Sequence, residues 1–349
     1  MTSATDVART GSRDTQPRAG IRTWQTWLQV LQTGNPPEGH LDLIGRWLVL
    51  TRASVLPMTV TAGLVAGLLA WWNADDASIG LWALAAAGIV LAHAANNLMN
   101  DLFDLDIGAD TREYPRALYA PHPVLSGMIS RRGLLVAALV VNVADLAILA
   151  ALTAARGVPV IAFALGGFLL SVAYTAPPLR LKKHGLGEPT VLVVWGPLMV
   201  GGTYYAATGS IPAEVVAASI PYALLSTAVL MGKHIDKIPW DEPAGTRTLP
   251  VMLGAGAARR ATQAMMVAFY PLVVVLVALG TLPIATLVIV LAVPRLVSTL
   301  RALDAPKPAE KPPGFPIWPL WYAAFVFLHT RRAGALMVLG MLVGVLLDL

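Results

Sequence analysis

The sequence contains no cysteine among its 349 residues. Without thiols the chain forms no disulfide framework and offers no thiolate nucleophile. Charged residues are also scarce, at 13% of the chain, whereas soluble domains carry about a quarter. Hydrophobic residues make up 56%, and the mean hydropathy is +0.65. These proportions argue against a pair of soluble domains and indicate a polytopic membrane protein.

Apolar runs recur along the chain, many of them about twenty residues long, which is the length that a helix needs to cross a bilayer. We therefore predict an all-α fold with about nine transmembrane helices. The apolar stretch 315–328 is expected to be an interfacial helix that leads into the last span. The predicted spans are residues 46–72, 79–104, 132–154, 158–175, 189–207, 212–233, 259–279, 282–301 and 333–347.

The N-terminal segment differs from the rest of the chain. Residues 1–20 are polar and are followed by no short apolar run with a cleavage site, so we expect disorder and no signal peptide. Residues 21–42 include Ile21, Trp24, Trp27 and Leu28, a spacing that suits a short amphipathic helix on the membrane surface. We therefore divide the chain into a disordered or interfacial segment, 1–42, and a membrane domain, 43–349.

The positive charges predict how the chain lies in the membrane. Lysine and arginine gather in one set of predicted loops, whereas the opposite loops contain Arg156 and no lysine. Because positively charged loops stay in the cytoplasm, we expect a cytoplasmic N-terminus and an external C-terminus in a bacterial plasma membrane. The net charge of +5 then reflects topology rather than nucleic-acid binding, and no protein partner can be inferred.

An acid-rich stretch, NLMNDLFDLDIGAD at 97–110, begins where the second apolar run ends. On a helix, His93, Asn97, Asn100, Asp101 and Asp104 share one face, which extends back into the apolar segment. Carboxylates at such a position are costly unless a cation compensates them, and oxygen ligands suit Mg²⁺. We therefore predict a magnesium site that binds a diphosphate; the alternative is a solvated loop with ordinary aspartates.

Two further stretches carry charge on the same predicted side. Residues 233–248 place Asp236 and Asp241 among Lys233 and Lys237, which suits a polyanion held partly through metal or, alternatively, a mixed-charge surface loop. Residues 174–188 form a basic patch that either contacts phosphate or only fixes the topology. Inside the spans, Arg52 either reaches the diphosphate or extends to the membrane surface. Asn142 and Asp145 share a face, either for function or for a structural hydrogen bond.

Together these motifs resemble the UbiA superfamily of intramembrane prenyltransferases over about residues 46–300. Asn100 and Asp104 match its first motif, and the later acid at Asp110 resembles the branch that prenylates 1,4-dihydroxy-2-naphthoate in menaquinone synthesis. The stretches 51–59, 174–188, 195–205 and 245–254 support this resemblance. The second motif departs from the family pattern, because Asp236 and Asp241 are five residues apart instead of four.

The resemblance implies helices around a central cavity that two acidic loops cap. It implies Mg²⁺-dependent transfer from a prenyl diphosphate to an aromatic acceptor beside membrane lipid. The implied metal ligands are Asn97, Asn100, Asp101, Asp104, Asp110, Asp236 and Asp241, of which Asn100, Asp104, Asp110, Asp236 and Asp241 are the catalytic candidates. The implied diphosphate contacts are Arg52, Arg116, Arg180, Lys182, Lys233 and Lys237.

Three other functions stay open on this scaffold: transfer to a non-aromatic acceptor, cyclisation of a prenyl diphosphate, and transport. A transporter would place its charges near the middle of the membrane, whereas most acids here collect at one face. The charge distribution therefore favours chemistry on a polyanion.

Overall fold

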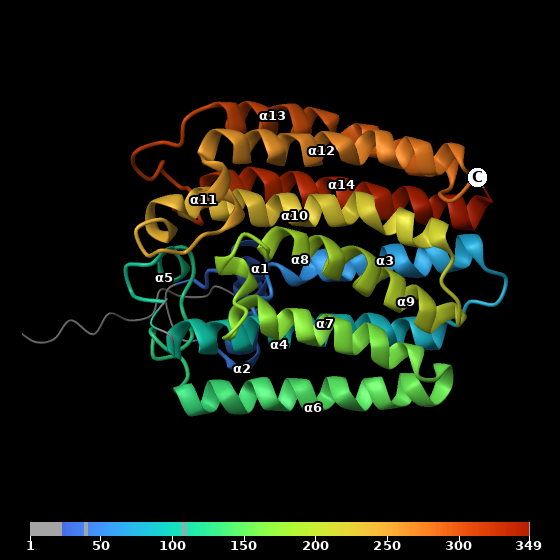
Figure 1. Cartoon of the computed structure of the whole chain (residues 1–349), viewed down its shortest axis with the longest axis horizontal. Helices are drawn as coiled ribbons and strands as arrows, with labels where there is room; N and C mark the ends of the chain where they lie inside the picture. The colour runs from blue at the N-terminus through green and yellow to red at the C-terminus, as the bar shows by residue number, and fades with distance from the viewer. Residues whose placement is uncertain (1–22, 38–40, 107, 109, 349) are drawn as a thin grey trace, which may run out of the picture.

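The computed structural model describes residues 23–37, 41–106, 108 and 110–348, and these residues form helices without any strand. Most helices lie side by side along one axis (Figure 1). The elements are α1 (Thr23–Thr33), α2 (Leu43–Leu50), α3 (Leu56–Asn73), α4 (Ile79–Asp106), α5 (Pro115–Tyr119), α6 (Arg131–Arg156), α7 (Pro159–Thr175), η1 (Leu181–Lys183), α8 (Gly187–Val193), η2 (Val194–Leu198), α9 (Met199–Thr208), α10 (Ala213–Asp241), α11 (Leu249–Leu253), α12 (Ala255–Ala278), η3 (Ile284–Ala292), α13 (Val293–Asp304) and α14 (Trp321–Leu347).

Within this part of the chain, eight helical segments are long and apolar enough to cross a membrane. They are Leu56–Asn73, Ile79–Asp106, Arg131–Arg156, Gly187–Thr208, Ala213–Asp241, Ala255–Ala278, Ile284–Asp304 and Trp321–Leu347. The fourth predicted span corresponds to α7, which is apolar but shorter. The predicted all-α membrane fold is thus confirmed, with eight full-length candidates and one shorter helix in place of nine equal spans.

The first and last spans differ from the sequence prediction. The first begins at Leu56 instead of residue 46, because residues 43–50 form the separate helix α2 and Pro57 occupies the first turn of α3. The last begins at Trp321, so the segment predicted as an interfacial helix at 315–328 is largely part of the membrane helix. Arg331 and Arg332 consequently lie inside α14, and Arg331 packs on the ring of Phe327.

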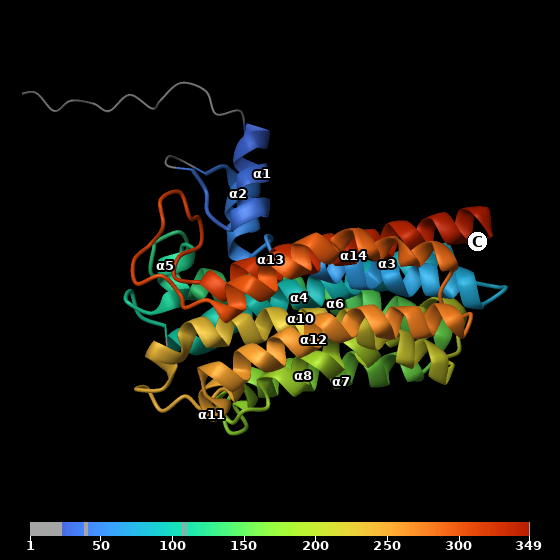
Figure 2. The ribbon, with the colours of Figure 1, turned by 90° about the horizontal axis from the view of Figure 1, so that it is seen from above.

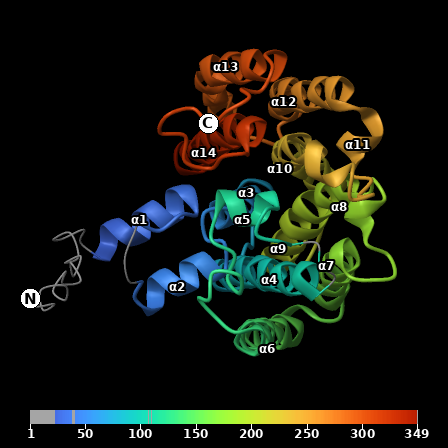
Figure 3. The same cartoon turned by 90° about the vertical axis from the view of Figure 1, so that its left-hand side faces the viewer.

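The connections on the two ends of the bundle are unequal. One end, which we call the loop-bearing end, carries α5, η1, α11 and the connection between α13 and α14, whereas the other has only short turns and the C-terminus (Figure 1). Viewed from the loop-bearing end, the long helices surround α3 and α10, and α5 lies across the near ends (Figure 3). Asn35 links two connections at the loop-bearing end, because its side-chain amide donates hydrogen bonds to the backbone oxygens of Tyr119 and Pro316.

The helices α1 and α2 project sideways from the bundle near the loop-bearing end (Figure 2). Asp42 caps the start of α2 and accepts a hydrogen bond from Trp27 of α1, which fixes the pair. Trp24, Leu28 and Leu43 are among its exposed apolar residues. The helix α1 falls within the segment predicted to contain a short helix, whereas Ile21 and the segment expected to be disordered lie outside the described residues.

Candidate active site

Asp101 is a buried carboxylate held by two arginines at the loop-bearing end of α4. Arg116 of α5 donates to both of its oxygens at 2.9 Å, and Arg52 pairs with it from the turn between α2 and α3. Arg52 has a left-handed backbone with φ of 53°, which costs energy in a non-glycine residue and persists only where its surroundings hold it. Because both carboxylate oxygens are occupied, Asp101 organises the two arginines instead of standing free for a metal.

Asp104 lies one turn further along α4 and pairs with Lys182 of η1. The lysine Nζ is 2.6 Å from both carboxylate oxygens. Burial lowers the pKa of Lys182 below its ordinary value, although the charge of Asp104 opposes this effect. The residues before Asp104 on the same face are fixed by hydrogen bonds, since Asn97 donates to the backbone oxygen of Thr51 and Thr175 donates to Asn100.

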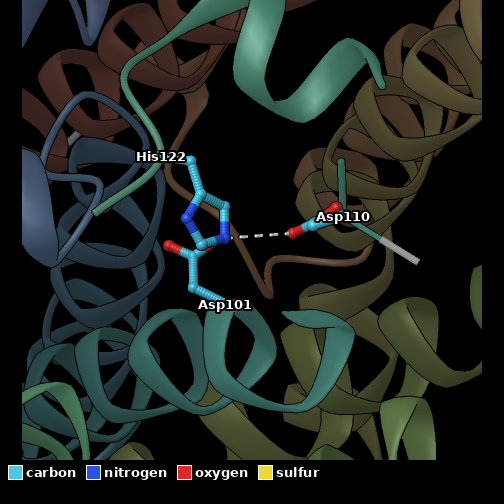
Figure 4. A group of neighbouring side chains, drawn as sticks. All are labelled: Asp101, Asp110 and His122. Atoms are coloured by element: carbon cyan, nitrogen blue, oxygen red, sulfur yellow. Dashed lines mark ion pairs between the residues drawn. The ribbon is translucent and has the colours of Figure 1, made fainter. Parts of the chain in front are cut away.

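Asp110 approaches the same region after the end of α4, as Figure 4 shows. Its Oδ2 atom lies 3.4 Å from Nε2 of His122 and has no hydrogen-bond partner among the described residues. Burial alone would raise the pKa of Asp110, but the neighbouring His122 ring and the charge of Arg52 outweigh it, so the pKa lies below its usual value.

The oxygen and nitrogen atoms of Asp101, Asp110 and His122 come within 4.8 Å of one another, a spacing that a metal could bridge. Nδ1 of His122, however, accepts backbone N–H groups from Val124 and Leu125. We therefore assign the ring proton to Nε2, which then faces the carboxylates and is no metal ligand. Nε2 lies 3.4 Å from Oδ2 of Asp110 without a hydrogen bond, so this oxygen remains available.

The helix α10 extends to Asp241, eight residues beyond the predicted end of its span, so the second acid cluster begins on a helix and not in a loop. Residues five apart on a helix point about 140° away from each other. Asp241 accepts a hydrogen bond from Tyr114 at 2.6 Å and lies 3.6 Å from Lys237. Asp236 faces the other way, where it accepts the backbone N–H of Ala323 and lies 3.4 Å from Lys307. The two predicted partners are therefore not brought together.

A polar cleft at the loop-bearing end gathers most of the predicted residues. Five cationic side chains and two carboxylates line it, together with an amide, three tyrosines and a histidine. Its lining residues are Arg52, Asn100, Asp104, Asp110, Tyr114, Arg116, Tyr119, Tyr174, Lys182, Lys233, His234 and Lys237. Of the other predicted residues, Asn97 lines a second, larger cavity, which is described next. Asp101 and Asp241 lie behind the cleft walls. Asp236 and Arg180 line neither space.

The cleft adjoins a mainly apolar cavity of about 920 Å³ between α4, α6, α7 and α9. Six residues line both spaces and so form the junction: Arg52, Asn100, Arg116, Tyr119, Tyr174 and Lys233. Asn142 and Asp145 also line the cavity, and Asn142 donates to the backbone oxygen of Ala138. A polar, cationic compartment is thus joined directly to an apolar one.

Tyr119 is a junction residue that the sequence analysis missed. Its ring lies under the cations of Arg116 and Lys233 at 5.7 and 5.8 Å. Desolvation alone would raise its pKa, but the charges of Lys233, Arg52 and Arg116 outweigh it and lower the pKa to about 8. His234 was missed too: its Nδ1 pairs with Glu188 at 2.7 Å, and the residue lines the cleft.

Comparison with known proteins agrees with this arrangement. Residues 57–329 match the model of the UbiA prenyltransferase family. The chain is 31% identical to the 1,4-dihydroxy-2-naphthoate octaprenyltransferase of Haemophilus influenzae over 60% of this chain and 69% of that protein. It is 27% identical to the 2-carboxy-1,4-naphthoquinone phytyltransferase of Synechocystis over 71% and 77% of the two chains, respectively.

Two solved structures share the fold. A UbiA homologue from Aeropyrum pernix aligns with a TM-score of 0.61 and 21% identity, covering 84% of this chain and 98% of that one. A homologue from Archaeoglobus fulgidus bound to GPP and Mg²⁺ aligns with a TM-score of 0.55 and 20% identity, covering 84% and 99%. The predicted resemblance is confirmed: the chain belongs to the UbiA prenyltransferase family and is an integral membrane prenyltransferase.

Proposed function

We propose that the protein transfers a prenyl group from a prenyl diphosphate to an aromatic, quinone-precursor-like acceptor in a Mg²⁺-dependent reaction. One observation carries the proposal: the cationic cleft opens through shared wall residues into the apolar cavity of about 920 Å³. A prenyl diphosphate has the same two parts, an anionic head and an apolar tail. The acceptor class rests on the relatives, which are named for naphthoate and naphthoquinone substrates.

The residues of the cleft fit a magnesium ion. Asp110, which lines the cleft, has a buried carboxylate oxygen without a partner in the described part of the chain, and such an oxygen is costly unless a cation binds it. Asp104 and Asp110, with the amide oxygen of Asn100, would hold the ion on the α4 side. When bound, the ion neutralises charge that develops on the leaving diphosphate.

The protein's own side chains account for the other steps. Lys233, Lys237 and Arg116 stabilise negative charge on the diphosphate as the allylic C–O bond breaks and its electron pair leaves with the phosphate. Lys182 has to move from Asp104 onto the diphosphate, which frees that carboxylate. The apolar cavity keeps water from the allylic cation. A ring carbon of the acceptor then forms the new C–C bond, and the proton of that carbon passes to an oxygen of the departing pyrophosphate.

The arrangement in the membrane is part of the same proposal. We place the loop-bearing end in the cytoplasm and the C-terminus outside, because the connections there carry most of the lysines and arginines. The catalytic unit comprises residues 43–349. The end of α1 and the residue after it add to this unit, since Gln32, Thr33 and Gly34 line the large cavity.

The test uses purified protein with Mg²⁺, a polyprenyl diphosphate and a panel of naphthoate and benzoate acceptors. Mass spectrometry identifies the product, and pyrophosphate release gives the rate. Asp104→Asn and Asp110→Asn should each lower kcat about 100-fold or more, the scale seen when one preorganised group is lost from an active site. Asp236→Asn should cost much less activity and act mainly on stability, because Asp236 faces Ala323 and Lys307.

Full activity of both Asp104→Asn and Asp110→Asn, or activity unaffected by chelation of the metal, would contradict the proposal. A reaction without acceptor tests the alternative that the protein cyclises a prenyl diphosphate. A cyclised hydrocarbon product under those conditions would identify a cyclase instead of a transferase.

A further inference from the structure

The face of α10 that borders the cleft carries lysines where the opposite wall carries acids. Lys233 and Lys237 are one turn apart and both line the cleft, together with His234. The carboxylates that line it, Asp104 and Asp110, come from α4 and the segment after it. The cleft therefore offers metal ligands on one wall and fixed ammonium groups on the other.

Asp241, the remaining acid on this side, is screened from the cleft by two side chains. Tyr114 donates its hydroxyl to Oδ1, and the ammonium of Lys237 lies 3.6 Å from the same oxygen. Lys237 in turn packs over the Tyr114 ring at 4.6 Å, which fixes both groups. A Mg²⁺ ion requires oxygen ligands at about 2.1 Å in an octahedron. An ion on Asp241 would thus lie close to a fixed positive charge.

The charges around the cleft can be compared with those of the ligand. Five cations and the carboxylates of Asp104 and Asp110 line it, and the carboxylates of Asp101, Asp241 and Glu188 lie behind it, so these groups sum to zero with histidine neutral. A fully ionised diphosphate ester carries three negative charges. With one divalent ion the complex has one negative charge, and with two it has one positive charge, so the total charge does not decide between them. The ammonium of Lys237 does, because it lies 3.6 Å from Asp241 and occupies the place beside that carboxylate.

We propose that this enzyme binds its prenyl diphosphate with a single divalent ion on the Asp104–Asp110 wall, and that the ammonium of Lys237 stands where a second ion would otherwise bind. The inference rests on the proposed function and specifies its metal stoichiometry. It gives Lys237 a charge-compensating role that a magnesium ion would otherwise fill, so the lysine contacts the diphosphate directly.

The experiment counts Mn²⁺ bound to the full chain in detergent. Farnesyl S-thiolodiphosphate, in which sulfur replaces the bridging oxygen at the bond that breaks, holds the complex without reaction. Free Mn²⁺ is measured by electron paramagnetic resonance during titration. We expect one bound Mn²⁺ per chain and a spectrum without coupling between neighbouring ions. Two bound ions in the wild-type protein would overturn the inference and leave the proposed function intact, whereas no bound ion would overturn both.

Variants test the role of the lysine. Lys237→Asp should raise the count from one Mn²⁺ to two in the presence of the analogue, because a carboxylate replaces the ammonium beside Asp241. Lys311→Asp makes the same charge change at an exposed position in the connection before α14 and should leave the count at one. A folded Lys237→Asp protein that still binds one ion, shown by an unchanged elution volume and thermal transition, would contradict this role.

Discussion

The phenol of Tyr119 lies where the anionic head and the apolar tail of the substrate must meet. Its environment contains the cations of Lys233, Arg52 and Arg116 and the carboxylate of Asp101, and the cations prevail. A lowered pKa means that the cationic junction stabilises the phenolate. Negative phosphate groups would reverse this, since they compensate the same cations.

This reversal predicts a pH effect on binding of inorganic pyrophosphate. The ligand should raise the pKa of Tyr119 from about 8 towards its ordinary value. Binding therefore takes up a proton, and affinity falls as pH rises from below 8 to above it. If the bound pKa returns to about 10, affinity falls about tenfold between pH 7 and pH 9 through this residue.

Isothermal titration calorimetry of wild-type protein and Tyr119→Phe measures this effect. The variant corrects for ionisation of the pyrophosphate itself and should lose less affinity over the same pH interval. Equal losses in both proteins would show that Tyr119 does not titrate in this range.

At the level of single residues, helical spacing predicted the polar face of α4 well. Asn100 and Asp104 both line the cleft, as periodicity indicated. The prediction that Asp236 and Asp241 act together assumed a loop after residue 233. The helix α10 continues through both residues instead, so their side chains point to different sides. Tyr119 gave no periodic signal, because its position depends on contacts between segments distant in sequence, such as Asn35 with the Tyr119 backbone.

The elements α14 and η3 pack closely against each other in the bundle. A Cβ atom at Gly340 would come within 2.5 Å of the backbone oxygen of Ala285 and 2.6 Å of Cα of Thr286. Backbone atoms cannot swing away as a side chain can. Small residues at such contacts let membrane helices approach closely, so this glycine sets the distance between the two elements.

We predict that Gly340→Ala destabilises the protein by about 1–3 kcal/mol, the usual cost of overpacking a tight contact. Gly80→Ala is the matched control in α4, because a Cβ there meets nothing within 4 Å. In thermal unfolding in detergent, Gly340→Ala should have a lower transition temperature than the wild-type protein, and Gly80→Ala should have an unchanged one. An unchanged transition in Gly340→Ala would mean that the two elements separate easily.

Helix existence was predictable from hydropathy, whereas boundaries depended on finer signals. Pro57 marks the start of α3, but because the residues of α2 just before it are also apolar, the sequence predicted one span over both helices. In α14 the adjacent arginines at 331 and 332 suggested a loop. The structure accommodates Arg331 against an aromatic ring, a contact that a linear charge count does not contain.

The whole molecule has its connections and its charge at one end, which makes its orientation testable. Because the sequence contains no cysteine, single-cysteine variants can be labelled without removing native thiols. Glu310→Cys lies in the exposed connection before α14 at the loop-bearing end, and Asp348→Cys lies at the opposite end.

In intact cells, a membrane-impermeant maleimide should label Asp348→Cys and not Glu310→Cys, and lysis should make both reactive. The reverse pattern would place the loop-bearing end outside the cell, away from a cytoplasmic supply of prenyl diphosphate.

The five cations of the cleft also act after the chemical step. Once the prenyl group has left, inorganic pyrophosphate carries up to four negative charges and still faces the same lysines and arginines. The product is therefore held more tightly by charge than the substrate head was. We expect pyrophosphate to be a strong product inhibitor, so the pace of the enzyme in a cell depends on how quickly pyrophosphate is hydrolysed around it.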